Sequence, residues 1–379
     1  MPVELVGIMS HRLASERVPV PPKVFDRRLA RTYAQAQEQA GYDRVLVAQS
    51  SFWPDSMPLA TYVTSITETL GVMVAHRPGF VAPTMAARMF ATLDHLSEGR
   101  AGIHIITAAN DKETRCDGDF LTKAERYRRS REFVGVLRGM WGAETPISHE
   151  GEFYRFENAL SELRPFAGPA LPIYWAGSSD LAIQFAGECA DIYAFSLSGL
   201  AESAALLERV QASAATAKRT ITGQGTVRVI LGDTEGQAWD NAKAILDRVI
   251  AHGEDRLRLT GSAAPLVSGG RREADLAGSV NASGVDRFAR LTGSDAVLDS
   301  GLWVGPQKEG IPMAPALVGT PTQVVGALMR FYRMGVTGFL MRGFDLLEDA
   351  VDHGRELIPR LRIAVAEEDA RMAADTAHG

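Results

Sequence analysis

The chain has 379 residues, enough for two average domains or one large α/β domain. Hydrophobic residues make up 46% and charged residues 23%, which is typical of an ordinary globular protein and excludes wholesale disorder. The net charge of −6 gives no support to nucleic-acid binding. Cys116 and Cys189 lie far apart without metal-ligand spacing, so neither a disulfide framework nor a metal site is expected.

The first residues, MPVELVGIMSHRLASER, combine a short apolar run with charges. They lack the basic start and long apolar region of a signal peptide, so we interpret them as a first strand and expect a cytoplasmic protein. No run approaches the eighteen or so apolar residues that span a bilayer, and no membrane association is expected.

Compact apolar runs without strict alternation follow one another along the chain, as expected for strands buried on both faces. The eight strand candidates are residues 3–9, 43–49, 70–76, 101–107, 172–177, 190–195, 227–232 and 337–342. Helical patterns lie between them, and several end in glycine, a common helix terminator. The clearest are residues 25–41, 82–99, 123–141, 200–219, 235–253 and 320–335.

Alternation of this kind predicts a (β/α)8 TIM barrel, with an open doubly wound sheet as the alternative. The glycine fingerprint of a dinucleotide-binding sheet is missing after the first strand, where SHRLASE stands, and this favours the barrel. In a barrel the loops that follow the strands share one face and form the active site. The side chains expected to converge there are His11, Trp53, Thr107, Ser178, Ser179 and Arg342.

The chain is predicted to be a single domain, residues 1–379, with two insertions over the C-terminal face of the strands. The first covers about 142–170 and contains SHEGEFYRF, a candidate hairpin. The second covers about 254–315 and has little apolar periodicity. It could be a lid over the site, a surface loop or an oligomer contact.

The stretch LPIYWAGSSD is followed by a helix-like segment, LAIQFAGECA. A strand that ends in Gly177, Ser178 and Ser179 before a helix offers free N–H groups, hydroxyls and the positive end of a helix dipole, which suits a phosphate. Plain helix capping is the alternative, since Ser is a preferred N-cap. The basic run ERYRRSRE is interrupted by acids and Tyr127, and its spacing suits a solvated helix face.

The run RPGFVAPTMAARMFATLDHLSEGRAGIHIIT, from Arg77 to Thr107, closely resembles the bacterial luciferase-like flavin monooxygenases, and within them the alkanesulfonate monooxygenase branch. Further matches follow in the same order as in that family. They are DGDFLTKAERYRRSREF, IYWAGSS, DTEGQAW, VGTPTQVV and GFDLLEDA. The resemblance covers nearly the whole chain apart from the two insertions.

The resemblance implies a barrel that uses reduced FMN, supplied by a separate NAD(P)H-dependent flavin reductase, and molecular oxygen. Gly177, Ser178 and Ser179 match the family's phosphate-binding turn, and Tyr127 matches a tyrosine that reaches the same phosphate. Thr107 matches the position beside the flavin ring, although it could instead cap the next turn.

His11 matches a histidine after the first strand of that branch, although it could be structural. Arg77 could be fixed by carboxylates as part of the scaffold, so it is not counted among the site residues.

Three departures from the alkanesulfonate branch affect the expected substrate pocket. Phe52 and Trp53 replace an arginine and a cysteine, which adds aromatic surface. Arg228 keeps a positive charge on the seventh strand. We expect it either to bind an anionic group or to form a structural ion pair. Phe344 replaces a tyrosine, and Arg342 adds a charge.

The predicted function is a two-component monooxygenase in which reduced FMN forms a flavin peroxide that oxygenates a small organic substrate. Arg228, Thr107 and His11 are the catalytic candidates. The resemblance implies an organosulfonate or another organosulfur compound, with C–S cleavage, and a homodimer or homotetramer. A deazaflavin-dependent dehydrogenase on the same barrel and a non-catalytic flavin-binding relative are the alternatives.

Overall fold

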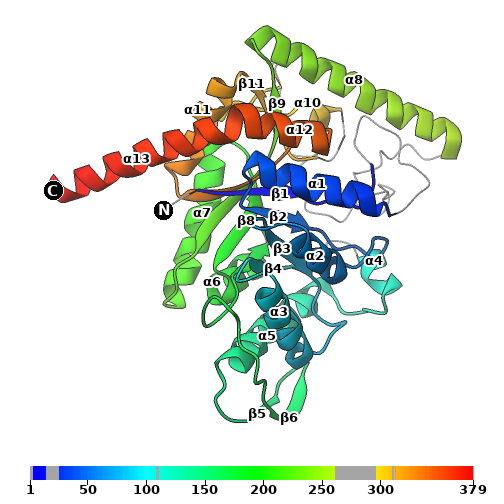
Figure 1. Ribbon diagram of the computed structural model, residues 1–379, viewed down its shortest axis with the longest axis vertical. Helices are drawn as coiled ribbons and strands as arrows, with labels where there is room; N and C mark the ends of the chain where they lie inside the picture. The colour runs from blue at the N-terminus through cyan, green and yellow to red at the C-terminus, as the bar shows by residue number, and fades with distance from the viewer. Residues whose placement is uncertain are drawn as a thin grey trace. The chain divides into compact units, whose positions relative to one another are not determined.

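Two compact units make up the chain, and Figure 1 labels their helices and strands. The computed structural model describes residues 3–13, 25–107, 111–260, 296–309, 311 and 313–378. The first unit comprises Met1–Asp43, Phe195–Leu207 and Thr222–Gly379, and the second comprises Arg44–Ala194 and Glu208–Ile221. Among the described residues, no helix has the length and apolarity needed to cross a membrane.

The second unit contains five parallel strands in the order β2-β3-β4-β7-β8. Its strands are β2 (Arg44–Val47), β3 (Gly71–His76), β4 (Ala101–Ile105), β7 (Ile173–Ala176) and β8 (Ile192–Ser196), whose last two residues belong to the first unit. Its helices are α2 (Ser56–Ser65), α3 (Pro83–Leu96), α4 (Asp111–Cys116), α5 (Lys123–Gly142) and α6 (Asp180–Cys189). Helix α7 (Leu200–Thr216) contributes residues to both units.

The first unit contains strands in the order β10-β11-β9-β12-β1, all parallel except the pair β10–β11. Its strands are β1 (Glu4–Ile8), β9 (Thr222–Leu231), β10 (Leu302–Trp303), β11 (Ala316–Gly319) and β12 (Val336–Arg342). Its helices are α1 (Arg27–Ala40), α8 (Glu235–Thr260), α10 (Gly305–Lys308), α11 (Pro321–Tyr332), α12 (Leu346–Asp352), a π-helical turn (His353–Leu357) and α13 (Ile358–His378).

The fold class is a (β/α)8 barrel, as the sequence predicted, and not an open doubly wound sheet. Its eight strands are β1, β2, β3, β4, β7, β8, β9 and β12, and each corresponds to one of the predicted apolar runs. Strands of this kind are buried on both faces: in β3, all residues from Gly71 to Ala75 are buried. The imidazole of His76 stacks on Phe133 of α5, with ring centroids 5.1 Å apart.

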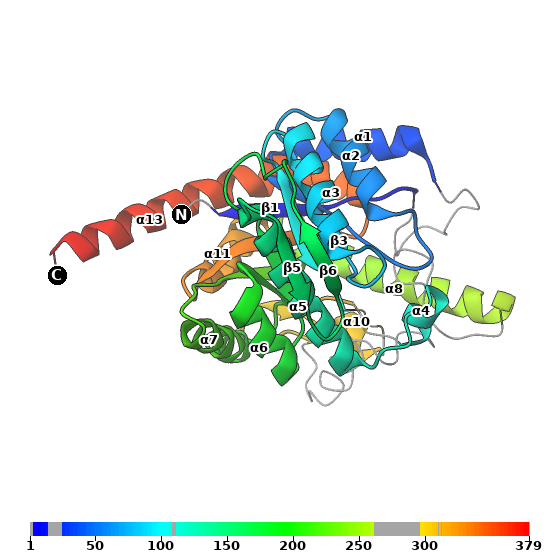
Figure 2. The same cartoon turned by 90° about the horizontal axis from the view of Figure 1, so that it is seen from below.

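The candidate hairpin in the first insertion is confirmed. Strands β5 (Ile147–Glu150) and β6 (Arg155–Ala159) pair antiparallel and lie beside α5 in Figures 1 and 2. Glu132 of α5 anchors the hairpin by accepting hydrogen bonds from the backbone N–H groups of residues 153 and 154. In the second insertion, helix α8 continues to Thr260, and residues 261–295, on which the lid interpretation depends, lie outside the described residues.

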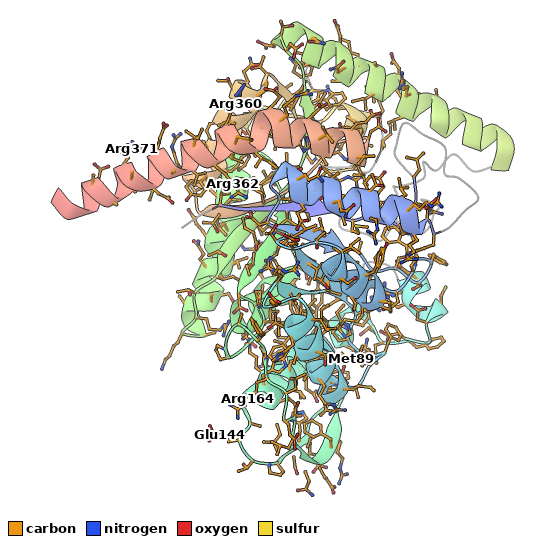
Figure 3. All side chains as sticks on the ribbon, in the orientation of Figure 1. Met89, Glu144, Arg164, Arg360, Arg362 and Arg371 are labelled. Carbon is orange, nitrogen blue, oxygen red and sulfur yellow. The ribbon has the colours of Figure 1, made fainter. Side chains whose placement is uncertain are left out.

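The C-terminal helix α13 is fastened to the first unit near its start. Arg362, labelled in Figure 3, donates to Asp43 Oδ1 at 2.9 Å and to the carbonyl of Gly41 at 2.8 Å. In Figures 1 and 2 the other end of α13 extends away from α11 and α12, and Met372 is 53% exposed there.

Candidate functional site

The turn between β7 and α6 is built around Gly177. Its φ of +126° is one that residues with a side chain rarely adopt. A Cβ at this position would lie 2.4 Å from Tyr127 Oη and 2.8 Å from the Cβ of Ala182. The carbonyl of Gly177 accepts a hydrogen bond of 2.7 Å from Tyr193 Oη. The turn and the Tyr127 hydroxyl are therefore in direct contact, which places two of the predicted cofactor-binding residues together.

Helix α6 begins at this turn with its first N–H groups near two exposed serines. Ser179 is the N-cap, and its Oγ accepts a hydrogen bond of 3.3 Å from the N–H of Ala182. The capping interpretation of Ser179 is therefore confirmed. Both Ser178 and Ser179 are nevertheless exposed. Asp180 in the first turn bears a negative charge, but it pairs with Arg209 at 2.7 Å. A helix N-terminus with exposed hydroxyls suits a phosphate dianion.

Arg126 contacts the candidate residue Thr107 and was not among the residues predicted for the site. Its side chain is 1% exposed and donates Nε–H to the carbonyl of Thr107 at 2.8 Å. The same guanidinium donates to the carbonyl of Leu121 at 2.6 Å and to Asp111 Oδ1 at 2.7 Å. Thr107 is half-buried just past the end of β4. One buried cation therefore fixes the backbone at the end of β4 and stands next in sequence to Tyr127.

The prediction of a solvated face for the basic run was wrong for half of its arginines. Arg126 and Arg129 are buried, and Arg129 pairs with buried Asp119. Arg128 and Arg131 are exposed. The signal was present in the sequence, because Arg126 stands four residues before Ser130 and seven before Phe133, on the buried stripe of α5.

The scaffold interpretation of Arg77 is confirmed. Its guanidinium lies 2.9 Å from Glu113 Oε1 and 3.2 Å from Asp117 Oδ2, and the side chains of Arg77 and Glu113 are 3% and 5% exposed. The predicted pocket residues Phe52 and Trp53 follow β2 in the same unit. Phe52 is 56% exposed and Trp53 is half-buried.

Arg228, Arg342 and Phe344 come together in the first unit. Arg228 of β9 is paired in register with Arg342 of β12, so their side chains leave the same face of the sheet. Arg228 is 3% exposed, donates Nη1–H to the carbonyl of Gly343 at 2.9 Å, and lies 4.5 Å from the ring centroid of Phe344. The predicted cation is thus held in a fixed position by a carbonyl and an aromatic face.

His11, the remaining catalytic candidate, is buried in the first unit. Burial lowers the pKa of His11 from 6.5 to about 4, and the neighbouring Arg12 charge adds to this effect. The imidazole is therefore neutral near pH 7. Neutral imidazole can accept or donate one hydrogen bond, but it cannot supply a positive charge to an anion.

The two cysteines lie in different environments. Cys116 is exposed, and Cys189 is buried, with burial raising the pKa of its thiol to about 12. Within the part of the chain that the structure describes, no three His, Cys, Asp or Glu side chains gather in a way that could hold a metal ion.

In (β/α)8 barrel enzymes the active site is built from the loops at the C-terminal ends of the strands, and the turn between β7 and α6 is such a loop. Residues 8–338 match the luciferase-like monooxygenase family, and the chain belongs to that family.

Solved structures with the same fold have different chemistries. A riboflavin lyase, RcaE, with modified FMN and riboflavin is 19% identical, with 96% of this chain and 92% of that chain covered and a TM-score of 0.74. The EDTA monooxygenase EmoA from Chelativorans sp. BNC1 is 18% identical (96% and 94% covered, TM-score 0.71). An F420-dependent secondary alcohol dehydrogenase with an F420-acetone adduct is 14% identical (95% and 99% covered, TM-score 0.64). At identities this low, the structural similarity shows that the chains share a fold, but it does not identify the substrate of this protein.

Proposed function

We propose that this protein is an FMN-dependent monooxygenase that holds the FMN phosphate at the turn between β7 and α6. The observation that carries the proposal is the contact of the Tyr127 hydroxyl with Gly177 at the N-terminus of α6. Because Gly177 has no side chain, the Tyr127 hydroxyl can approach this turn, close to the backbone N–H groups and the hydroxyls of Ser178 and Ser179. Such donors favour a dianion.

Reduced FMN, when bound, would supply the electrons with which molecular oxygen is activated. Tyr127, Ser178 and Ser179 would bind the phosphate and so set the depth of the cofactor in the barrel. Thr107 would lie along the flavin, where Arg126 holds its carbonyl by a hydrogen bond of 2.8 Å. His11, being neutral, would contribute a hydrogen bond rather than a charge to the site.

Arg228 is the residue that we assign to an anionic group of the substrate. Its guanidinium is buried and is held by Gly343 and Phe344 before any substrate arrives, so binding an oxyanion would require little reorganisation. Arg342, its partner in register, adds a second cation to the same face. Phe52, Trp53 and Phe344 would supply apolar surface for the rest of the substrate.

An organosulfonate or another organosulfur compound, cleaved at its C–S bond, meets these requirements. Arg228 suits the anionic group, and the branch that the sequence resembles acts on alkanesulfonates. We further propose that a separate NAD(P)H-dependent reductase supplies the reduced FMN and that the protein is a homodimer or homotetramer. The chain as a whole would act as a single barrel domain.

A deazaflavin-dependent dehydrogenase is the second candidate, favoured by the solved neighbour that carries an F420-acetone adduct. It would transfer hydride without consuming oxygen. A non-catalytic flavin-binding relative would bind FMN without turning over any substrate. Protein-dependent release of sulfite from alkanesulfonates with reduced FMN and oxygen would identify the monooxygenase. Anaerobic reduction of F420 by a secondary alcohol would identify the dehydrogenase, and FMN binding without either activity would identify the non-catalytic relative.

The phosphate site itself is tested by a Ser178→Ala/Ser179→Ala double variant. We expect FMN to bind at least about tenfold more weakly, because each lost hydroxyl bond contributes about 1 kcal/mol. Thr320→Ala is the matched control, since Thr320 caps α11 through its hydroxyl in the same way as Ser179 caps α6. Unchanged FMN affinity in the double variant, measured by fluorescence titration, would place the phosphate elsewhere.

A further inference from the structure

The loop between β2 and α2 carries two aromatic side chains on a compact backbone. We call residues 49–55 the aromatic loop. Ser50 organises it: its Oγ accepts from the N–H of Phe52 at 3.4 Å, and its carbonyl accepts from the N–H of Trp53 at 3.1 Å. Gln49 Oε1 accepts from the N–H of Ser56 at 3.0 Å and closes the loop onto α2. Movement of this backbone would therefore carry both rings with it.

Ser51, in the middle of the aromatic loop, is bound to α4. Its Oγ donates to Asp117 Oδ2 at 2.5 Å and also lies 3.0 Å from the carbonyl of Glu113. Its backbone N–H donates to Glu113 Oε1 at 3.2 Å. The residues that follow β4 therefore hold the loop that follows β2.

Arg77 completes this network from the end of the intervening strand, β3. It donates Nη1–H to Ser51 Oγ at 3.0 Å and to Asp117 Oδ2 at 3.2 Å, and Nη2–H to Glu113 Oε1 at 2.9 Å. Because Arg77 and Glu113 are both buried, water weakens the bond between them less than it weakens an exposed ion pair. A single guanidinium thus joins the segments after three neighbouring strands.

We infer that Arg77 is a positioning residue for the aromatic loop, which sets the place of Phe52 and Trp53 through Ser51 and thereby selects the substrate. The inference rests on the proposed function in one respect, namely that these two rings line the substrate pocket. Arg77 bonds to Ser51, Glu113 and Asp117, whereas Tyr127 and Gly177 are organised by other groups. Loss of Arg77 should therefore affect substrate selection far more than flavin binding.

Two variants test the inference, and the first disrupts the network less than the second. Ser51→Ala removes the hydroxyl that joins the loop to Arg77 and Asp117 but leaves the ion pair of Arg77 with Glu113 intact. Arg77→Lys keeps the positive charge but loses the planar guanidinium, whose two terminal nitrogens bond to Ser51, Asp117 and Glu113 at once. The matched control is Arg128→Lys, because Arg128 forms an exposed ion pair with Glu152 at 2.9 Å on the surface of α5.

The first readout is hydrogen exchange of the backbone amides of residues 51–53 in the full chain without flavin. We expect at least about tenfold faster exchange in both Ser51→Ala and Arg77→Lys, and no change in Arg128→Lys, because exchange reports local opening. Unchanged exchange in Ser51→Ala and Arg77→Lys would overturn the inference. This readout needs no substrate, so it decides the positioning role even if the proposed function fails.

The second readout compares KM and kcat for a series of straight-chain alkanesulfonates with the Kd for FMN. The inference expects the ratio of kcat/KM between long and short chains to change at least about fivefold in Arg77→Lys, mainly through KM, while the Kd for FMN stays within about twofold. Equal losses of FMN affinity and of kcat/KM for every chain length would show a general scaffold role and overturn the inference. Failure of the unmodified protein to oxidise any sulfonate would contradict the organosulfonate proposal instead.

Discussion

Replacing Gly177 with alanine should damage the turn between β7 and α6 in two separable ways. A residue with a side chain at a φ of +126° costs on the order of 1–3 kcal/mol in backbone strain. The added Cβ would also come within 2.4 Å of Tyr127 Oη, which must then move in a buried environment. We expect Gly177→Ala to lower the free energy of unfolding by about 2–4 kcal/mol in total.

The contribution of the clash can be isolated with Tyr127→Phe, which removes Oη and leaves the ring. If the contact is real, Gly177→Ala should cost about 1 kcal/mol less in the Tyr127→Phe background than in the native one. Gly118→Ala is the control for backbone strain, since Gly118 has a φ of +84° and a Cβ added there would meet no atom within 4 Å. Urea unfolding of the four variants measures these differences. Equal effects of Gly177→Ala in both backgrounds would refute the contact.

Three other perturbations follow from the same geometry. Arg126→Gln should destabilise the fold by about 3 kcal/mol, much more than exposed Arg128→Gln, when both are compared by urea unfolding. Arg228→Lys should raise KM for an anionic substrate at least about tenfold with little change in the Kd for FMN; similar losses in both would show that Arg228 is misassigned. Acid should also destabilise the fold, because burial lowers the pKa of four histidines from 6.5 to about 4. Their neutral form is favoured in the fold, so stability that is present above about pH 6.5 is lost as the pH falls towards 4. At pH 5 the loss is up to about 2 kcal/mol for each of His76, His104 and His353, and smaller for His11. A urea midpoint that does not fall between pH 7 and pH 5 would contradict this. The histidines are His11, His76, His104 and His353.

The strands of the barrel were predictable because each is a short apolar run buried on both faces. Strand β11 (Ala316–Gly319) was missed, since its four residues stand between prolines and threonine and offer no periodicity. Helix α8 continues past Gly253, where the sequence analysis ended it, because a glycine in the last turns is tolerated when the helical pattern goes on.

The site was harder to predict than the strands. Tyr127 and Gly177 are far apart in the sequence, and no spacing rule connects them; the resemblance alone suggested that they meet. Arg126 was missed because a run of arginines is ordinarily solvated, although its spacing to Ser130 and Phe133 places it on the buried stripe of α5. The carbonyls of Thr107 and Leu121 and the carboxylate of Asp111 satisfy its guanidinium there. Two of the groups that hold Arg228, the carbonyl of Gly343 and the ring of Phe344, carry no charge pattern that a sequence could reveal.

The rigidity of the turn at Gly177 has a kinetic consequence. The hydrogen bond from Tyr193, the close approach of Tyr127 and the Ser179 cap all restrict this turn, so its backbone has little freedom to rearrange. A phosphate arriving there would not have to wait for a loop to order itself, and its capture rate could approach that of diffusion. If reduced FMN reaches the protein through water, as proposed, rapid capture would limit the time in which it can lose its electrons to oxygen.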